Sequence, residues 1–207
     1  MEVKDLKPQA VFEIFDQITK IPRPSKKEEK IRQFILDFAK AHGIEAMADK
    51  AGSVILRKPA SKGHENAPTT ILQGHMDMVC ESDHPGFDFE HNPIETLVEG
   101  EWVRAKGTTL GADNGIGVLA VMTDPDLVHG PLEALFTVDE ETGMTGANAL
   151  EKGELKGTIL INLDSEDDAE IFVGCAGGID TVATFKYGRS MAPEDFHYFL
   201  MDVRDGL

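Results

Sequence analysis

Three short apolar runs, separated by segments with helical character, constrain the fold of this chain most strongly. The runs cover residues 69–77 (TTILQGHMD), 132–140 (LEALFTVDE) and 157–166 (GTILINLDSE), and each turns polar only near its end. Such runs are typical of strands that are covered on both faces, as in parallel sheets. Residues 114–125 and 143–150 are expected to form helices between them. This alternation predicts an α/β fold with a mixed, largely parallel sheet sandwiched by helices.

The N-terminal region is predicted to be helical. Apolar residues recur at helical spacing in residues 8–18 and 25–43. Ser25 followed by Glu28 is typical of a capping box, which predicts that the second helix starts there. Further strands are expected at residues 53–57, in a hairpin at 95–107, and in a final pair at 169–178 and 179–188.

Composition limits the classes of function. The 207 residues are 41% hydrophobic, which favours a folded domain over disorder. A net charge of -17 argues against nucleic acid or an anionic membrane as a partner. Cys80 and Cys175 do not form a disulfide framework and are interpreted as reduced, structural thiols. Because residues 1–15 lack the pattern of a signal peptide and no run could span a bilayer, we expect a soluble cytoplasmic protein.

Side chains that bind metals follow several of the predicted strands. They are His75 and Asp77 in "GHMD", Asp113 in "GADNG", Asp139, Glu140 and Glu141 in "VDEE", and Asp164 in "LDSEDD". In open α/β sheets, sites form just outside the carboxyl ends of the strands, so convergence of these ends would bring the side chains together. Imidazole and carboxylate ligands suit zinc, with cobalt or manganese as substitutes. The sequence therefore predicts a metal centre.

The residue types also suggest a division of labour within that centre. His75 and Asp77 are two positions apart on an extended segment, so one can bind a metal while the other orients it. Asp113 has two carboxylate oxygens and can bridge two ions. Glu140 and Glu141 would point in different directions if extended, so that one binds a metal and the other transfers protons. Each motif alone is also typical of a turn or a solvated surface, and only their joint occurrence is specific.

Five motifs together resemble a known family. "LQGHMDMVCE", "GTTLGADNGIG", "LFTVDEETGMTGA", "INLDSED" and "VGCAGG" are similar to aminoacyl-histidine dipeptidases, which belong to the di-zinc metallopeptidases that include carnosinases and carboxypeptidase G. The resemblance implies a zinc-exopeptidase-like catalytic domain that holds two zinc ions. It also implies hydrolysis of Xaa-His dipeptides, carnosine-like ones included, by metal-activated water.

The resemblance further assigns a role to each metal ligand. It implies that His75 and Asp164 hold one zinc ion, that Glu141 holds the other, and that Asp113 bridges the two ions. It also implies a cis peptide bond between Asp113 and Asn114.

The remaining two carboxylates receive catalytic roles from the same resemblance. Glu140 would be the general base, and Asp77 would support the site by orienting a ligand. Two alternatives remain: another hydrolase on the same scaffold, such as a tripeptidase, an aminoacylase or a carboxypeptidase, or a non-catalytic metal-binding protein. The presence of both Glu140 and Asp77 argues against the second alternative, since a binding site needs neither.

Family members are roughly twice as long as this chain and contain an inserted lid domain. The resemblance therefore implies that residues 1–187 are the N-terminal part of a catalytic domain, and that residues 188–207 form a linker and the start of a truncated lid. A last histidine ligand would then be absent, and the fragment is expected to bind one metal ion at best and to have little activity. The complete enzyme would form a homodimer through the lid.

Overall fold

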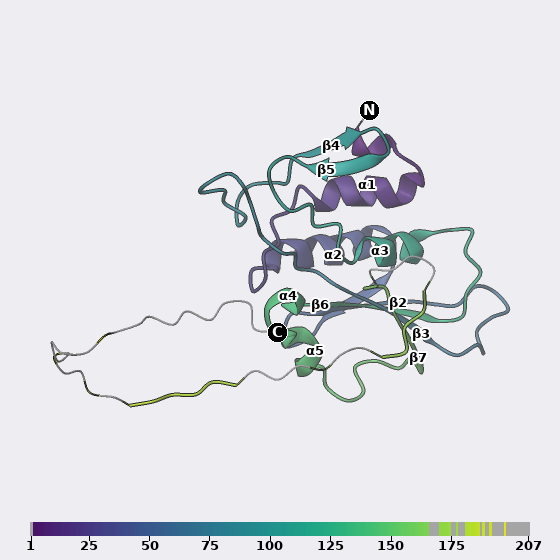
Figure 1. Cartoon of the computed structure of the whole chain (residues 1–207). Coiled ribbons are helices and arrows are strands. Elements are labelled where there is room, and N and C mark those ends of the chain that lie inside the picture. Colours follow the sequence, from purple (N-terminus) through teal and green to yellow (C-terminus); the bar gives the residue numbers. More distant parts are fainter. Residues whose placement is uncertain are drawn as a thin grey trace. The chain divides into compact units, whose positions relative to one another are not determined.

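The computed structural model describes residues 2–165 and, beyond them, residues 170–174, 177, 181–186, 188, 191 and 197 (Figure 1). Residues 1–169 form one compact unit, and residues 170–207 form a second. In the second unit, the described residues take part in no strand pairing. The strand pair expected at 169–178 and 179–188 is therefore wrong for those residues, and its other positions lie outside the described part. A segment with the apolar pattern of a strand becomes a strand only where a neighbouring strand accepts its backbone hydrogen bonds.

A five-stranded sheet with the order β1-β2-β6-β3-β7 forms the centre of the first unit. The strands are β1 (Glu45–Ala48), β2 (Val54–Lys58), β3 (Thr70–His75), β6 (Leu132–Thr137) and β7 (Ile159–Asn162). β3 pairs in parallel with both β6 and β7, whereas β2 pairs antiparallel with β1 and β6. Four strands thus share one direction and only β2 opposes them. The predicted α/β class with a mixed, largely parallel sheet is confirmed, although β1 was not predicted.

Helices lie in layers over one face of this sheet, with α2 (Glu29–Ala41) and α3 (Ile116–Thr123) next to the strands and α1 (Gln9–Ile18) farther out (Figure 1). α3 lies between the sheet and α1, and its Val118, Leu119 and Met122 side chains are buried. α1 and α2 turn only their apolar sides inward, as the helical spacing predicts. Burial of this face forms the main hydrophobic core.

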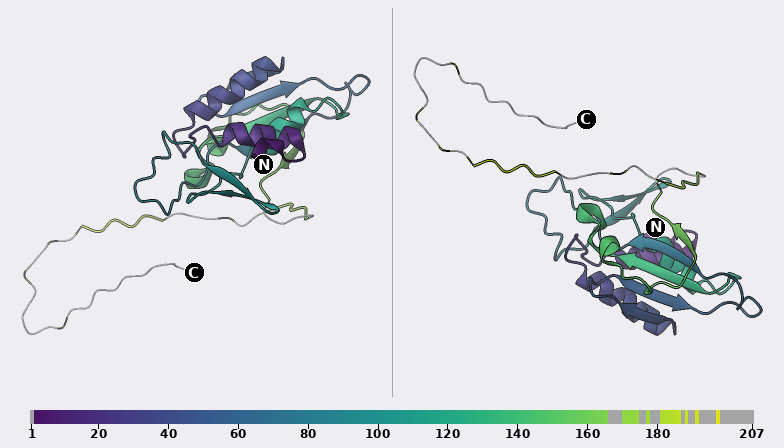
Figure 2. Two further views of the ribbon diagram at one scale, coloured as in Figure 1. Left: turned by 90° about the horizontal axis from the view of Figure 1, so that it is seen from above. Right: turned by 90° about the horizontal axis from the view of Figure 1, so that it is seen from below.

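The opposite face of the sheet is covered by a smaller apolar cluster and by shorter helices. Ile55, Ile71 and Leu135 form a second apolar cluster there, against which Leu150 and Leu155 pack. Figure 2 shows this side in the view from below, where α4 (Glu140–Gly143) and α5 (Thr145–Ala149) lie beside the strands. The helices therefore cover the two faces unequally, and β7 remains exposed at the edge of the sheet.

A short hairpin lies beyond α1 (Figure 1). Its strands, β4 (Thr96–Glu99) and β5 (Trp102–Ala105), pair antiparallel, which confirms the predicted hairpin at residues 95–107. A 3-10 helix, η1 (Val3–Asp5), precedes α1. No helix in the described residues has the length and apolar character needed to cross a bilayer.

Candidate metal centre

The shared direction of β3, β6 and β7 places their carboxyl ends at one edge of the sheet. His75 is the last residue of β3 and Asp164 lies two positions beyond β7. β6 ends at Thr137, opposite His75, and Glu140 begins α4 shortly afterwards. The parallel register thus delivers an imidazole and two carboxylates to the same place, as expected from the site rule for open sheets.

The side chains converge around the Nε2 atom of His75. This atom lies 2.9 Å from Oδ1 of Asp113 and 3.9 Å from Oδ2 of Asp164. In the described part of the chain, two overlapping groups have ligand atoms within 4.8 Å of one another: His75 with Asp113 and Glu141, and His75 with Glu140 and Asp164. All five side chains predicted to bind metal or transfer protons there are therefore brought together, while residues 166–169 after Asp164 lie outside the description.

The site is closed on the side of His75 and open on the side of the carboxylates. The His75 side chain is 1% exposed, whereas the Asp113 side chain is 65% exposed. One imidazole and several carboxylates form a donor set that suits zinc, cobalt or manganese. The clustering of these donors around an accessible point therefore fits a divalent metal ion.

Asp77 holds His75 in place from the buried side. Its Oδ1 atom lies 3.2 Å from Nδ1 of His75, which leaves Nε2 facing the other carboxylates. The Asp77 carboxylate also accepts hydrogen bonds from Ser25 Oγ at 2.7 Å and from the backbone N–H groups of Glu140 and Glu141 at 3.1 and 3.2 Å. Burial would raise the pKa of Asp77, but these hydrogen bonds outweigh it and lower the pKa to about 2.

The surrounding carboxylates also control the charge of His75. Burial lowers its pKa, but the hydrogen bond to Asp77 and the negative charges of Asp77, Asp113 and Asp164 outweigh this and raise the pKa to about 9. Without a metal ion the ring is therefore protonated at neutral pH. A metal ion bound at Nε2 would have to displace that proton.

Glu140 and Glu141 differ from the sequence-based expectation in their backbone. They were expected at the end of an extended strand, but they form the first turn of α4, after Asp139 with a φ of 53°. Adjacent helical residues project roughly 100° apart, so the two carboxylates still diverge. Burial, the main cause, raises the pKa of both side chains, and neighbouring carboxylates add to the rise. A raised pKa suits a group that accepts and returns a proton.

The loop that carries Asp113 packs closely against β3. The Asp113–Asn114 peptide bond is cis, which confirms the expectation from the family resemblance. Oδ1 of Asn114 accepts a hydrogen bond from the backbone N–H of His75 at 3.3 Å. A Cβ atom at Gly74 would lie 2.0 Å from this same oxygen. Glycine at position 74 thus allows the approach that places Asp113 beside His75.

Sequence reasoning missed three supporting residues in the segment before α2. Ser25 and Glu28 do not form the predicted capping box, because α2 starts at Glu29 and the Ser25 hydroxyl donates to Asp77 instead. As a cap, the Ser25 hydroxyl would accept a hydrogen bond from a helix N–H group, whereas here it donates to a buried ionised carboxylate, which makes a stronger, charge-assisted hydrogen bond. Glu28 accepts a hydrogen bond from Asp139 N at 2.9 Å, and Arg23 is almost fully buried. The spacing of these residues gave no signal of either contact.

Cys80 and the remaining histidines take no part in the site. Burial raises the pKa of the Cys80 thiol to about 11, which agrees with a structural role, and Cys175 lies outside the described residues.

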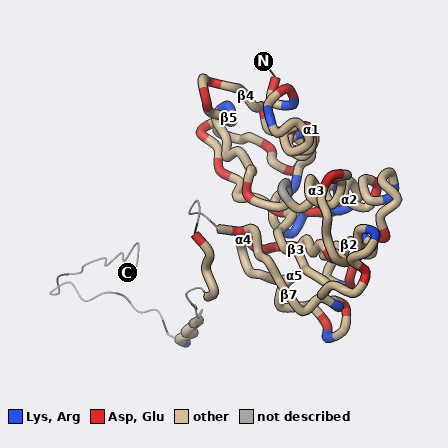
Figure 3. Tube along the Cα trace, turned by 90° about the vertical axis from the view of Figure 1, so that its right-hand side faces the viewer, with Lys and Arg blue, Asp and Glu red and all other residues tan. Residues whose placement is uncertain are grey.

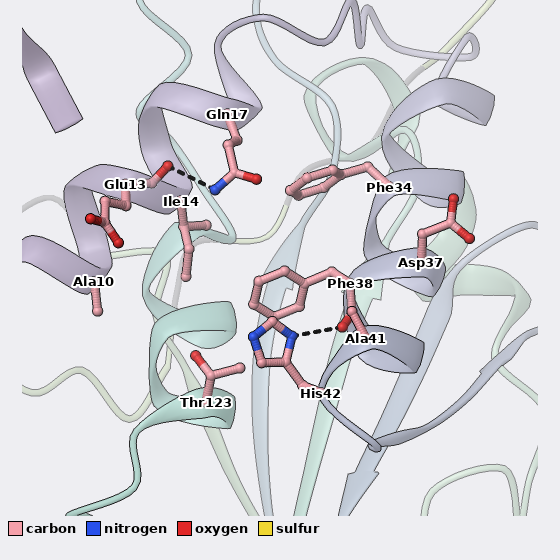
Figure 4. A pocket seen from close by; sticks show the side chains of 10 residues that line it. All are labelled: Ala10, Glu13, Ile14, Gln17, Phe34, Asp37, Phe38, Ala41, His42 and Thr123. Atoms are coloured by element: carbon pink, nitrogen blue, oxygen red, sulfur yellow. Dashed lines mark hydrogen bonds between the residues drawn. The ribbon is translucent and has the colours of Figure 1, made fainter.

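Figure 4 shows a separate hollow of about 400 Å³ between α1, α2 and α3, in which Nδ1 of His42 donates a hydrogen bond to the Phe38 carbonyl at 2.8 Å. The other histidines are exposed or half-buried: His64, His84, His91, His129 and His197.

A smaller cavity of about 180 Å³ adjoins the candidate metal centre. Glu140 and Asp164 contribute to its wall, and Leu135, Leu150 and Leu160 supply apolar surface. Figure 3 shows that acidic residues are spread along the whole trace of the compact unit, including α4. The site therefore combines negative charge with an adjoining apolar space.

The imidazole and the carboxylates lie together at the strand ends of a largely parallel sheet. They form the donor set of a metal-dependent hydrolase. The chain belongs to the peptidase family M20/M25/M40, whose sequence profile matches residues 71–193. It is 44% identical to the cytosol non-specific dipeptidase of Escherichia coli, over 98% of this chain and 43% of that protein. The family resemblance expected from the five motifs is confirmed.

Solved structures agree with this family. The crystal structure of aminoacylhistidine dipeptidase from Vibrio alginolyticus matches with a TM-score of 0.78 and 47% identity, over 81% of this chain and 35% of that chain. Aminopeptidase PepT from Bacillus cereus matches with a TM-score of 0.66 and 24% identity, over 78% of this chain and 44% of that chain, which shows the shared fold alone. The chain thus spans less than half the length of these relatives.

Proposed function

We propose that these residues belong to a zinc-dependent dipeptidase that hydrolyses Xaa-His dipeptides, including carnosine-like ones. The observation that carries this proposal is the convergence of His75, Asp113, Glu140, Glu141 and Asp164 at one edge of the sheet. The names of the relatives from Escherichia coli and Vibrio alginolyticus support dipeptide hydrolysis. The adjoining cavity has a size that suits a side chain of a small peptide.

The proposed ligand roles are those that the family resemblance implies, and the convergence of the five side chains supports them. His75 and Asp164 would hold one zinc ion, Glu141 would hold the other, and Asp113 would be a ligand that both ions share. Cobalt or manganese would substitute, since both accept the same nitrogen and oxygen donors. When bound, such ions polarise the peptide carbonyl and make nearby water more acidic.

Glu140 is the proposed general base. Its carboxylate takes a proton from the attacking water molecule and returns it to the nitrogen of the leaving amine. The rise in its pKa on burial supports this role, because a base with a pKa nearer neutrality can both accept and release a proton. Asp77 forms a hydrogen bond with Nδ1 of His75, so that Nε2 remains directed at the carboxylates.

Elemental analysis of zinc per chain, beside a hydrolysis assay on carnosine and other Xaa-His dipeptides with both this chain and the complete protein, tests the proposal. The Escherichia coli relative serves as the positive control for hydrolysis. We expect bound zinc in the unaltered chain and its loss in His75→Ala. A chain that binds no zinc, cobalt or manganese would contradict the metal centre.

Substrate class separates the proposal from its alternatives. Comparison of Xaa-His dipeptides with Gly-Gly-X tripeptides and N-acyl amino acids distinguishes a dipeptidase from a tripeptidase, an aminoacylase or a carboxypeptidase. Equal hydrolysis of many unrelated dipeptides would favour broad specificity, in line with the name of the Escherichia coli relative. Metal binding without any hydrolysis, even by the complete protein, would favour a non-catalytic metal-binding protein.

We also propose a domain organisation, a location and partners for the protein. Residues 1–187 constitute the N-terminal part of the catalytic domain, and residues 188–207 lead into a lid domain through which the enzyme forms a homodimer. The cytosolic name of the Escherichia coli relative supports a cytoplasmic location. Small peptides are the expected partners, while the acidic charge of -17 disfavours nucleic acid and anionic membranes.

A further inference from the structure

Arg23 is a buried charged side chain that lies directly behind the candidate metal centre. It is 2% exposed. Its Nη1 atom donates to the carbonyl oxygens of Met76 at 3.2 Å and Asp77 at 3.0 Å, and its Nη2 atom donates to the carbonyl oxygen of Gly111. One guanidinium group therefore joins the end of β3 to the loop that carries Asp113.

Two neighbours of Arg23 reach other parts of the same centre. The Ser25 hydroxyl donates to Oδ2 of Asp77 at 2.7 Å, and this carboxylate in turn contacts His75. Oε1 of Glu28 accepts a hydrogen bond from the backbone N–H of Asp139 at 2.9 Å, immediately before Glu140. Arg23 and Ser25 thus both contact the end of β3, Arg23 also contacts the loop of Asp113, and Glu28 contacts the segment before α4.

These contacts bear on the geometry of the centre because its ligands come from separate parts of the sequence. The end of β3, the loop around Asp113 and the start of α4 are each attached to a different strand or helix. Their relative positions depend on what joins them. Residues 23–28, which we name the bracing segment, contact all three.

We infer that the bracing segment positions the metal ligands, with Ser25 acting through Asp77 on His75 and Arg23 acting on the loop of Asp113. Ser25 and Arg23 are positioning residues, since neither belongs to the groups of converging ligand atoms. The inference rests on the proposed function in taking His75, Asp113 and Glu141 as metal ligands. A segment that only stabilised the fold would leave metal affinity unchanged once the protein is folded.

Ser25 offers the sharper test, because its hydroxyl can be removed or conserved with little change in volume. Cobalt(II) chloride is titrated into the full chain, and both affinity and the visible absorption bands of the bound ion are recorded. Outer hydrogen bonds to metal ligands typically change affinity by about 10–100-fold. We therefore expect Ser25→Ala to weaken cobalt binding by at least about tenfold and to shift the bands, while Ser25→Thr stays within about threefold of the unaltered chain.

Ser61→Ala is the matched control. The Ser61 hydroxyl also makes two hydrogen bonds, donating to Leu127 O at 3.3 Å and accepting from His129 N at 3.1 Å, but it contacts no proposed ligand. Cobalt affinity should be unchanged in this variant. Because both variants remove one hydroxyl, a loss of cobalt affinity confined to Ser25→Ala separates positioning of the ligands from the general effect of the substitution.

Wild-type cobalt affinity in Ser25→Ala would overturn the inference, as would an equal loss in Ser61→Ala or a failure of threonine to restore binding. Arg23→Lys gives a second reading, since lysine keeps the charge but lacks the fork that joins two segments. It should weaken cobalt binding in a folded chain. If this variant does not fold, the comparison of Ser25→Ala with Ser25→Thr is the test of the inference. Absence of cobalt binding by the unaltered chain would instead refute the metal centre itself.

Discussion

Nε2 of His75 lies 2.9 Å from Oδ1 of Asp113, although the two residues are 38 positions apart in the sequence. His75 ends a buried strand, whereas Asp113 belongs to a glycine-rich loop before α3. Their contact requires the loop to fold back over the end of β3, where Asn114 bonds to the backbone of His75. This juxtaposition forms the centre of the proposed site, and the following predictions probe the groups around it.

Replacing Glu140 with glutamine should remove the proposed base while retaining the metal ion. Glutamine has nearly the same shape but cannot accept a proton at neutral pH. In a chain with dipeptidase activity, turnover should fall by about 10²–10⁴-fold, the usual contribution of general base catalysis. Zinc content measured in parallel should stay constant. Glu151→Gln, at an exposed position that pairs with Lys50, is the control and should leave turnover unchanged. Near-normal turnover in Glu140→Gln would refute the role.

Replacing Glu141 with alanine should instead reduce metal content. Its carboxylate belongs to the group with His75 and Asp113, so its loss removes one of few protein donors. Elemental analysis after dialysis against a weak chelator provides the measurement. The variant should retain clearly less zinc than Glu140→Gln, and equal zinc in the two variants would count against the assignment.

The stability of the metal-free chain should decrease as the pH rises from neutrality. The pKa of His75 in the folded chain is about 9, above the ordinary value of 6.5, so protonation of His75 favours the folded state. This contribution is fully present below pH 6.5 and is lost as the pH rises through about 9. A difference of this size corresponds to about 3 kcal/mol in the free energy of unfolding.

Urea unfolding in the presence of a chelator, at several pH values between neutrality and pH 9.5, measures this decrease. A His75→Gln chain lacks the titrating ring and should show a much flatter profile over the same range. If both chains lose stability equally, the raised pKa of His75 is not the cause.

Replacing Gly74 with alanine should disturb the site through its backbone. The new Cβ atom would lie 2.0 Å from Oδ1 of Asn114 and 3.1 Å from the backbone nitrogen of Gly115, so the loop must move. Overpacking of this kind destabilises a protein by about 1–3 kcal/mol. Cobalt affinity should fall as well, because Asp113 moves with Asn114. Gly188→Ala, where the new Cβ atom would meet no atom of the described residues within 4 Å, is the control for both measurements. Unchanged stability and affinity in Gly74→Ala would contradict the close packing.

The sequence predicted much of the sheet and of the candidate site because both depend on local patterns. Apolar runs located β3, β6 and β7, and the polar residues that end them supplied His75, Glu141 and Asp164. Parallel pairing then determined that these ends meet. The ligand roles stay predictions, since the structure gives the arrangement of the donors and not their function.

Contacts between distant segments escaped prediction for a physical reason. Ser25 has the spacing of a helix cap, but its hydroxyl contacts a carboxylate 52 positions away. Arg23 looks like a surface residue between prolines, yet it is buried against backbone carbonyls. Such choices depend on which acceptors the fold brings near. Local patterns carry no information about them. For the same reason, the sequence did not predict that α4 starts at Glu140.

The Asp77 carboxylate is shared between the ring of His75 and the backbone of Glu140 and Glu141. The proposed metal binding and the proposed proton transfer are consequently coupled at position 77, since a substitution there would perturb the groups assigned to both. Asp113 and Asp164 carry no such double attachment to α4 among the described residues. Efforts to retune the enzyme for a different ion, while preserving its chemistry, should therefore begin at those two aspartates.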